Sequence, residues 1–434
     1  MSVKRILQYG IYLFLLFIQM ACSGGNKDRD SVLEYWSSNN IGEITFSREI
    51  VEAWNLKHPE STLKFQPIPE GQSSEEIILA AVVGKTTPDI YSNMWQGIVE
   101  FYAKANVLVP LDTLAGFEDF VHDRCDSLTI REITSSDGHI YQFPWKINPF
   151  MTIYNKKFLA ELNLDTLPNT YTEYLNAAEK FKKDLDGDGY VDQWFGNTSV
   201  RLVWYQRLFN FYTLYIAASD GLPLIKNNRA FFNNEYAIEA FRFLQEIYKQ
   251  SYFSKEDQTA GQDPFLAGKI ATKFTGPWEI EYLERYKPEG FDYDYFPIPV
   301  PEDHQGPVYT YCDPKSIVIF NTCTEPQIAF EFIKTMVDKK GDLLFLQTTK
   351  QLPRRKGLDT IKAYENFFNE NQRLQAFVEQ AKYIRGMDNC EVITEVLDII
   401  TQEYEACVLH DMKEPEKAIA DAERAVNILL GSQK

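Results

Sequence analysis

The chain has 434 residues, of which 44% are hydrophobic and 24% are charged, which is enough for two or three domains with sizeable cores. Its formal net charge of −18 argues against a non-specific nucleic-acid binder, which would need a basic surface. The 25 Tyr and 7 Trp are harder to assign to core packing than the 30 Phe, because they also carry polar groups.

The N-terminus has the pattern of an export signal over residues 1–21. Lys4 and Arg5 form a short basic region, and the apolar run 6–20 follows it. This run is about 15 residues long, whereas a membrane-spanning helix needs roughly 20. We therefore expect the rest of the chain to lie outside the cytoplasm.

Cys22 directly follows the apolar run, after Ala21 and before Ser-Gly-Gly. This context resembles a bacterial lipobox, in which the cysteine is lipidated and becomes the first mature residue. Gln19 departs from that pattern, which usually has Leu there, so an ordinary cleaved signal with a chance cysteine is the alternative. Residues 22–30 are polar and contain glycine, which is typical of a flexible tether.

The five other cysteines contain no CxxC pair, which disfavours structural zinc and thioredoxin-like chemistry. They are Cys125, Cys312, Cys323, Cys390 and Cys407. Cys312 and Cys323 could form a disulfide, and buried free thiols are the simpler interpretation.

The first part of the chain alternates strand and helix patterns. Strands are expected at 32–36, 62–65 and 88–91, with a helix between the first two whose apolar face holds Ile50 and Trp54. This β-α-β-α order predicts a mainly parallel sheet covered by helices.

The second part also mixes strands and helices. Thr170 and Glu173 form a capping box that opens a helix, and 237–248 is an amphipathic helix. Strands are expected at 150–154 and 316–320, and the C-terminal third is helical. The proline-rich run 296–301 cannot lie inside a central strand, because proline lacks the N–H that a ladder needs.

Short motifs follow one another in an order that resembles the family 1 extracellular solute-binding proteins, the receptor subunits of sugar ABC importers. The resemblance covers about residues 31–430 and is carried by EYWSS at 34–38, TPDIY at 87–91, VLVPLD at 107–112, GHIYQFPW at 138–145, IYNK at 153–156, LPNTY at 167–171, FLAGKIA at 265–271, TGPW at 275–278, PIP at 297–299 and LPRR at 352–355.

The resemblance implies an α/β, type II periplasmic-binding-protein fold, with two lobes of mainly parallel sheets and a hinge between them. One lobe would hold 31–146 plus 311–350, and the other would hold 147–310 plus 351–434. The ligand would lie in the cleft between the lobes.

A sugar site needs flat aromatic rings for C–H faces, and polar side chains that both donate and accept hydrogen bonds. Trp278, after Gly276-Pro277, matches a position that often stacks on a sugar ring in the family. Any single Trp can instead belong to the core, as we expect for Trp54 on its helical face. The candidate ligand-binding residues are Trp36, Ser38, Asn40, Asn93, Trp95, Trp145, Asn148, Trp204, Trp278, Asp313 and Arg355.

The segment 184–192 has the acidic spacing of an EF-hand-type calcium loop. Its expected ligands are Asp184, Asp186, Asp188, the carbonyl of Tyr190, and Asp192, with Gly189 at the sharp turn. The twelfth position is Phe195 instead of a bidentate Glu, so a further ligand would come from elsewhere. The predicted ion is structural, and a solvated acidic turn is the alternative.

No HExxH, GxSxG, Walker A or GxGxxG motif is found in the sequence, so no enzyme class is supported. We expect a monomeric, non-catalytic receptor that binds a carbohydrate and passes it to ABC permease subunits, with contact to the membrane only through the lipid anchor. A surface-anchored glycoside hydrolase and a receptor that presents its ligand to a sensor kinase are the alternatives. Another polar solute, such as a glycerol phosphate, also stays open as the ligand.

Overall fold

The computed structural model describes residues 32–69, 72–255 and 263–432. The predicted export signal at 1–21, the lipidation site at Cys22 and the tether at 22–30 lie outside these residues. Within the described ranges, every helix is too short or too polar to cross a bilayer.

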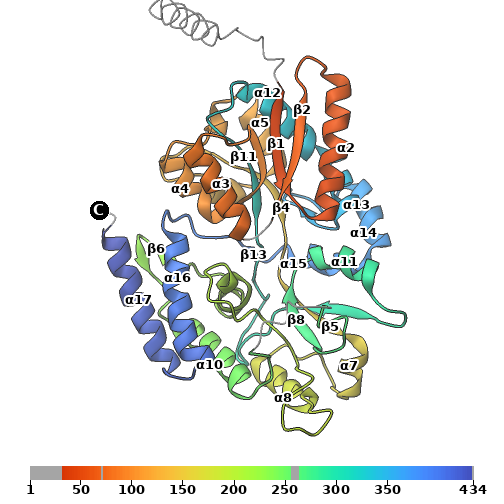
Figure 1. Cartoon of the computed structure of the whole chain (residues 1–434), viewed down its shortest axis with the longest axis vertical. Coiled ribbons are helices and arrows are strands. Elements are labelled where there is room, and N and C mark those ends of the chain that lie inside the picture. The colour runs from red at the N-terminus through yellow and green to blue at the C-terminus, as the bar shows by residue number, and fades with distance from the viewer. Residues whose placement is uncertain (1–31, 70–71, 256–262, 433–434) are drawn as a thin grey trace, which may run out of the picture.

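The first lobe is built on a six-stranded sheet in the order β12-β4-β11-β3-β1-β2 (Figure 1). Its strands are β1 (Leu33–Ser38), β2 (Leu63–Ile68), β3 (Ile90–Trp95), β4 (Phe143–Ile147), β11 (Lys315–Ile319) and β12 (Leu352–Pro353). The first three strands are parallel, whereas β11 is antiparallel to both β3 and β4, and β12 is antiparallel to β4. The type II fold is as expected, but this sheet is mixed instead of mainly parallel, because β11 enters it from the opposite end.

Helices flank this sheet in the upper half of Figure 1. They are α2 (Ile41–Lys57), α3 (Gln72–Gly84), α4 (Val99–Lys104), α5 (Phe117–Arg124), α6 (Ser127–Ile133), α12 (Pro326–Val337) and α13 (Lys339–Thr349), with short 3-10 turns η1 (Gln96–Ile98) and η2 (Leu111–Thr113). Helix α2 buries Phe46, Ile50 and Trp54 against the sheet, as its apolar spacing predicts.

The second lobe contains a three-stranded antiparallel sheet in the order β8-β5-β9, formed by β5 (Met151–Asn155), β8 (Thr272–Thr275) and β9 (Tyr293–Phe296). A short hairpin joins β6 (Ile225–Lys226) and β7 (Arg229–Ala230). Strand β9 ends at Phe296, the first residue of the proline-rich run, so the prolines lie outside the strand, as predicted. This sheet is also not parallel, because each neighbour of β5 runs opposite to it.

The second lobe is rich in helices. These are α7 (Lys156–Glu161), α8 (Tyr171–Phe181), η3 (Leu208–Tyr212), α9 (Thr213–Ala218), α10 (Glu235–Lys249), α11 (Trp278–Tyr286), α14 (Lys362–Glu370), α15 (Gln372–Gln380), α16 (Ile393–Tyr404), η4 (Glu405–Leu409) and α17 (Pro415–Ser432). The capping box of Thr170 and Glu173 is present at the start of α8, and η3 and η4 are π-helices.

The chain passes between the lobes at three places: after β4, before β11 and after β12. Just before the second crossing, β10 (Thr310–Tyr311) pairs with β13 (Ile384–Arg385). Strand β12 pairs with β4, so the first sheet extends slightly past the predicted limit at 350. The other predicted boundaries of the two lobes stay predictions.

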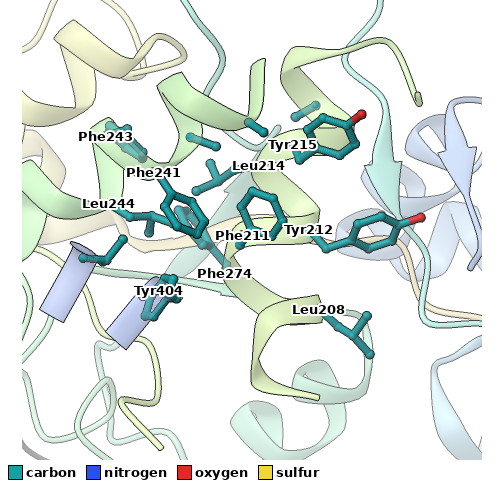
Figure 2. Packing of buried hydrophobic residues seen from close by; sticks show 14 of the residues in the cluster. Leu208, Phe211, Tyr212, Leu214, Tyr215, Phe241, Phe243, Leu244, Phe274 and Tyr404 are labelled. Carbon is teal, nitrogen blue, oxygen red and sulfur yellow. The ribbon is translucent and has the colours of Figure 1, made fainter. Parts of the chain in front are cut away.

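Aromatic side chains dominate the core of the second lobe. Figure 2 shows Phe211, Phe241 and Tyr404 in one packed group, with Phe211 and Phe241 ring centroids 5.0 Å apart, and Phe241 and Tyr404 5.9 Å apart. Both pairs are edge-to-face, which suits the charge distribution of aromatic rings. The five cysteines in the described part of the chain are buried free thiols, so Cys312 and Cys323 are not paired.

Candidate functional site: a cavity between the lobes

A cavity of about 290 Å³ lies between the two lobes. Its walls are Asn40, Glu43, Ser74, Glu75, Asn93, Trp95, Lys146, Asn148, Trp204, Tyr205, Leu208, Phe209, Trp278, Asp313, Lys315 and Gln351. The predicted site residues that the structure places around this cavity are Asn40, Asn93, Trp95, Asn148, Trp204, Trp278 and Asp313.

Three neighbouring strands bring the polar wall together. Strands β3 and β4 end at the same edge of the first sheet, where the antiparallel β11 begins. Lys315 lies opposite Trp95 on one side and opposite Lys146 on the other. Residues that are far apart in the sequence therefore meet at one edge of the sheet, as in other α/β ligand sites.

The second lobe contributes an aromatic wall. Trp204 packs on Trp95 of the first lobe, with ring centroids 4.8 Å apart and planes inclined by 36°. Phe150 stacks on Phe209 at 5.2 Å and meets Trp278 edge-to-face at 5.3 Å. Phe150 is buried behind them, whereas Trp95, Trp204, Phe209 and Trp278 line the cavity and offer apolar faces of the kind that sugar C–H groups contact.

A short hydrogen-bond relay fixes the Trp95 ring. The indole Nε1 donates to the hydroxyl of Tyr311 at 2.9 Å, and that hydroxyl donates to Asp313 Oδ1 at 3.2 Å. Lys315 Nζ donates to the same carboxylate oxygen at 3.0 Å. Burial raises the pKa of Tyr311 well above its ordinary value, so the hydroxyl keeps its proton and remains a donor.

Glu43 is the centre of a second polar network, and the sequence analysis did not identify it. Its side chain is 1% exposed and forms an ion pair with Lys146, which is 2% exposed. Ser38 Oγ donates to Glu43 Oε2 at 2.8 Å, and Gln351 Nε2 donates to Oε1 at 2.9 Å. Asn148 Nδ2 extends the chain by donating to Gln351 Oε1 at 3.1 Å.

Two carbonyl oxygens at the cavity have no hydrogen-bond partner among the described residues. They are Oδ1 of Asn93 and Oδ1 of Asn148, and both are buried. Buried acceptors are almost always satisfied in folded proteins. These two atoms are therefore the acceptors best placed for the hydroxyl groups of a ligand.

Glu75 adds a carboxyl group to the rim of the cavity from α3. Burial raises its pKa from 4.5 to about 7, and the positive charge of Lys315 acts in the opposite direction. With a pKa of about 7, this carboxyl group changes its protonation state close to neutral pH.

Two predicted tryptophans belong to the first-lobe packing instead of the cavity. Trp145 is 1% exposed and lies against Phe46 and Phe345, with ring centroids at 6.2 and 5.0 Å. Lys146 Nζ lies over the Trp145 ring, 4.8 Å from its centroid, so the indole packs behind the Lys146–Glu43 pair and does not line the cavity. Trp36 is half-buried and packs against the apolar group under α3 and α4.

Ser38 and Arg355 also do not line the cavity. Ser38 is fully buried and acts behind it, through its hydrogen bond to Glu43. Arg355 Nε donates to Asp342 Oδ2 at 2.6 Å, and Arg124 Nη1 donates to the same oxygen at 2.6 Å. Arg355 is thus part of a structural ion network in the first lobe.

The cavity residues that were missed had weak signals in the sequence. They are Glu43, Ser74, Glu75, Lys146, Tyr205, Leu208, Phe209, Lys315 and Gln351. Helical spacing from Trp204 and Tyr205 leads to Leu208 and Phe209 four residues on, and strand alternation from Asn148 leads to Lys146. Charged residues such as Glu43 instead have the pattern of a solvent-exposed helix turn.

The loop at 184–192 brings three carboxylates together at the surface. Oxygens of Asp184, Asp186 and Asp188 lie within 4.8 Å of one another. Asp184 accepts from the backbone of Gly187 at 2.7 Å and Gly189 at 2.8 Å, and these hydrogen bonds lower its pKa.

Asp192 and Tyr190, the other expected ligands of the loop, take part in hydrogen bonds with its backbone. Asp192 Oδ2 accepts from Leu185 N at 2.7 Å, and Tyr190 N donates to Asp188 Oδ1 at 2.8 Å. The twelfth position supplies no side-chain oxygen, because Phe195 has none, and its ring is fully buried in the core. The first three aspartates thus fit a hard, oxygen-seeking cation better than the end of the loop does.

Comparison with known proteins gives the same fold. The chain is similar to the arabinooligosaccharide-binding protein of Bacillus subtilis (strain 168), 25% identical over 183 residues, a match that spans only 40% of each chain. It is also similar to the sn-glycerol-3-phosphate-binding periplasmic protein UgpB of Rhizobium meliloti (strain 1021), 22% identical over 86% of this chain and 88% of that one. The sugar-binding protein MalE of Xanthomonas citri has the same type II fold, with a TM-score of 0.74 and 17% identity over 93% of this chain and 98% of that chain. The family described as bacterial extracellular solute-binding protein matches residues 49–369, and the chain therefore belongs to this family of extracytoplasmic solute-binding proteins.

Proposed function

We propose that the protein binds a carbohydrate between its lobes and delivers it to the permease subunits of an ABC importer. The observation that carries the proposal is the composition of the cavity. Aromatic rings of Trp95, Trp204 and Trp278 face it, and the acceptors of Asn93 and Asn148 lie beside them. This combination suits a neutral polyol with apolar C–H faces.

The charge balance of the cavity favours a neutral ligand over a phosphate ester. Lys146 is paired with Glu43, and Lys315 is paired with Asp313. Glu75 adds a further carboxyl group. The walls thus hold three acidic and two basic side chains, and an anionic ligand would meet no surplus of positive charge.

A glycoside hydrolase would need two carboxyl groups free to act on the glycosidic bond. Glu43 instead accepts from Ser38 and Gln351 and pairs with Lys146, and Asp313 is occupied by Tyr311 and Lys315. Glu43 and Asp313 therefore serve the wall of the cavity. Among the described residues, Glu75 is the one carboxyl group that remains in the walls, and a hydrolase needs two, which supports a binding role.

A calorimetric titration of the full chain tests the proposal, with a panel of neutral oligosaccharides, sn-glycerol 3-phosphate as the anionic comparison, and chromogenic glycosides in parallel. We expect saturable binding of an oligosaccharide, no binding of the phosphate ester and no release of chromophore. Release of the chromophore without saturable binding of an oligosaccharide would favour the hydrolase. Tight binding of the phosphate ester would show that the charge argument is wrong.

We also propose that the loop 184–192 binds a structural calcium ion, with Asp184, Asp186 and Asp188 as side-chain ligands. The closeness of their carboxylates supports this. Removing calcium with EGTA should lower the Tm, and adding calcium back should restore it. Asp186→Asn should abolish this calcium dependence, and an unchanged Tm in the wild type would leave the loop as a solvated turn.

The remaining expectations concern location and assembly. We propose that Cys22 carries a lipid that anchors a monomeric receptor to the outer face of a membrane. The sequence pattern around Cys22 supports this. Globomycin treatment or Cys22→Ser should prevent processing and thereby change the mass of the cell-associated protein. Labelling with palmitate would reveal the lipid on the wild-type protein independently.

A further inference from the structure

Arg207 is a fully buried cation at the start of the π-helix η3. Its side chain is 0% exposed. Nη2 donates to the backbone oxygen of Arg201 at 3.3 Å, and Nε and Nη1 have no partner with hydrogen-bond geometry in the part of the chain that the structure describes.

No acidic side chain among the described residues balances this charge. The groups that act electrostatically on Arg207 are the phenols of Tyr404 and Tyr248, which are neutral at physiological pH. The guanidinium carbon lies 3.7 Å from the centroid of the Tyr404 ring, a cation–π contact. A buried charge with unused donors is costly unless a counter-charge and hydrogen-bond acceptors accompany it.

A further unused donor lies on the same turn. Asn210 is 1% exposed, and its Nδ2 has no partner among the described residues. It follows Arg207 by three positions, in the opening turn of the π-helix. The hydroxyl of Tyr404 interacts with Arg207 and Tyr248, but no partner meets full hydrogen-bond geometry among the described residues. Donors from three side chains thus accompany one positive charge.

We propose that Arg207 and Asn210 bind a small inorganic anion, chloride, inside the second lobe. An anion supplies both the missing negative charge and the acceptor for N–H and O–H donors. A monoatomic ion is chosen because it needs the least space, and the surrounding side chains, Tyr248 and Tyr404 among them, are fully buried. Figure 2 shows Tyr404 within this aromatic core.

The anion would lie behind the aromatic wall of the cavity. Trp204, Tyr205, Leu208 and Phe209 line the cavity from the segment that contains Arg207. Holding Arg207 in place would therefore hold this wall, and chloride should raise the affinity for the sugar. This coupling rests on the proposed function, whereas the anion site itself does not.

Bromide provides a direct test, because it replaces chloride and is visible by anomalous scattering. Crystals of the wild-type protein grown in sodium bromide should show an anomalous peak within hydrogen-bond distance of Arg207 and Asn210. Ordered water with no anomalous signal at this place would overturn the proposal, whether or not any sugar binds.

Melting in solution gives a second, independent readout. At constant ionic strength, replacing gluconate with about 0.2 M chloride should raise the Tm by several degrees in the wild type. Arg207→Gln should remove this chloride dependence, and Arg242→Gln, at an exposed ion pair with Glu416, should keep it. An equal response in all three proteins would show a general salt effect and contradict the site. If Arg207→Gln does not fold, the bromide experiment decides alone.

Discussion

Trp278 is the first residue of α11, and its half-exposed indole lies at the cavity. The ring meets Phe150 edge-to-face and leaves a face for a ligand. We expect Trp278→Ala to weaken carbohydrate binding at least tenfold, about 1.4 kcal/mol. Calorimetric titration would measure this, with Tyr286→Ala as the control, because Tyr286 is exposed at the other end of the same helix. Equal affinities for the wild type and Trp278→Ala would remove Trp278 from the site.

Glu75 predicts a pH dependence of stability. Its pKa is 4.5 in an unfolded chain and about 7 in the folded protein, so the folded state holds the proton more tightly. Its contribution to the free energy of unfolding therefore falls as the pH rises from 4.5 towards 7. Glu75→Gln cannot ionise, so it should gain stability relative to the wild type between about pH 5 and about pH 8.

Urea unfolding at both pH values measures this difference. Glu76→Gln, at an exposed neighbouring position on α3, is the matched control and should show no comparable gain. A stability difference between Glu75→Gln and the wild type that is the same at both pH values would contradict the prediction.

At the scale of elements, Asp342 joins parts of the first lobe that are distant in the sequence. It lies in α13, is 1% exposed, and accepts hydrogen bonds from Arg124 of α5 and from Arg355 after β12. Asp342→Asn removes the negative charge that balances the two buried guanidinium groups of Arg124 and Arg355. We expect a loss of about 3–5 kcal/mol in the free energy of unfolding, measured with denaturant.

The exposed Asp359 is the control for this change. It lies 3.7 Å from Lys382, and such surface pairs contribute only about 0–1 kcal/mol. If Asp342→Asn and Asp359→Asn have similar effects, the network around Asp342 does not support the fold as we describe.

The elements differ in how well local patterns predict them. The helices α2, α8 and α10 follow from apolar spacing and capping residues, because these act within one turn. The direction of β11 was not predicted, because it depends on a crossing from the other lobe. In the same way, motif position identified Trp95 and Trp278, whereas Glu43 and Lys146 become a buried pair only when α2 and β4 meet.

At the scale of the whole molecule, both lobes line the cavity, so a ligand that contacts both walls favours a closed arrangement. Small-angle scattering should show a smaller radius of gyration when a saturating oligosaccharide is added. The same ligand concentration should cause a smaller change in Trp278→Ala, because less of that protein is bound. An unchanged radius at demonstrated saturation would argue against lobe closure on binding.

The order of strands in the first sheet has a consequence for how the chain folds. Strand β11 lies between β3 and β4, although the whole β5 to β10 segment separates it from them in the sequence. Until residue 315 is available, β3 and β4 have no common neighbour, and their facing edges stay open. Pairings between such distant segments are slow to form. The first lobe is therefore expected to complete its folding late. A fragment that ends before β11 also lacks β12, so it would expose both edges of β4 and one edge of β3, and such open edges promote aggregation.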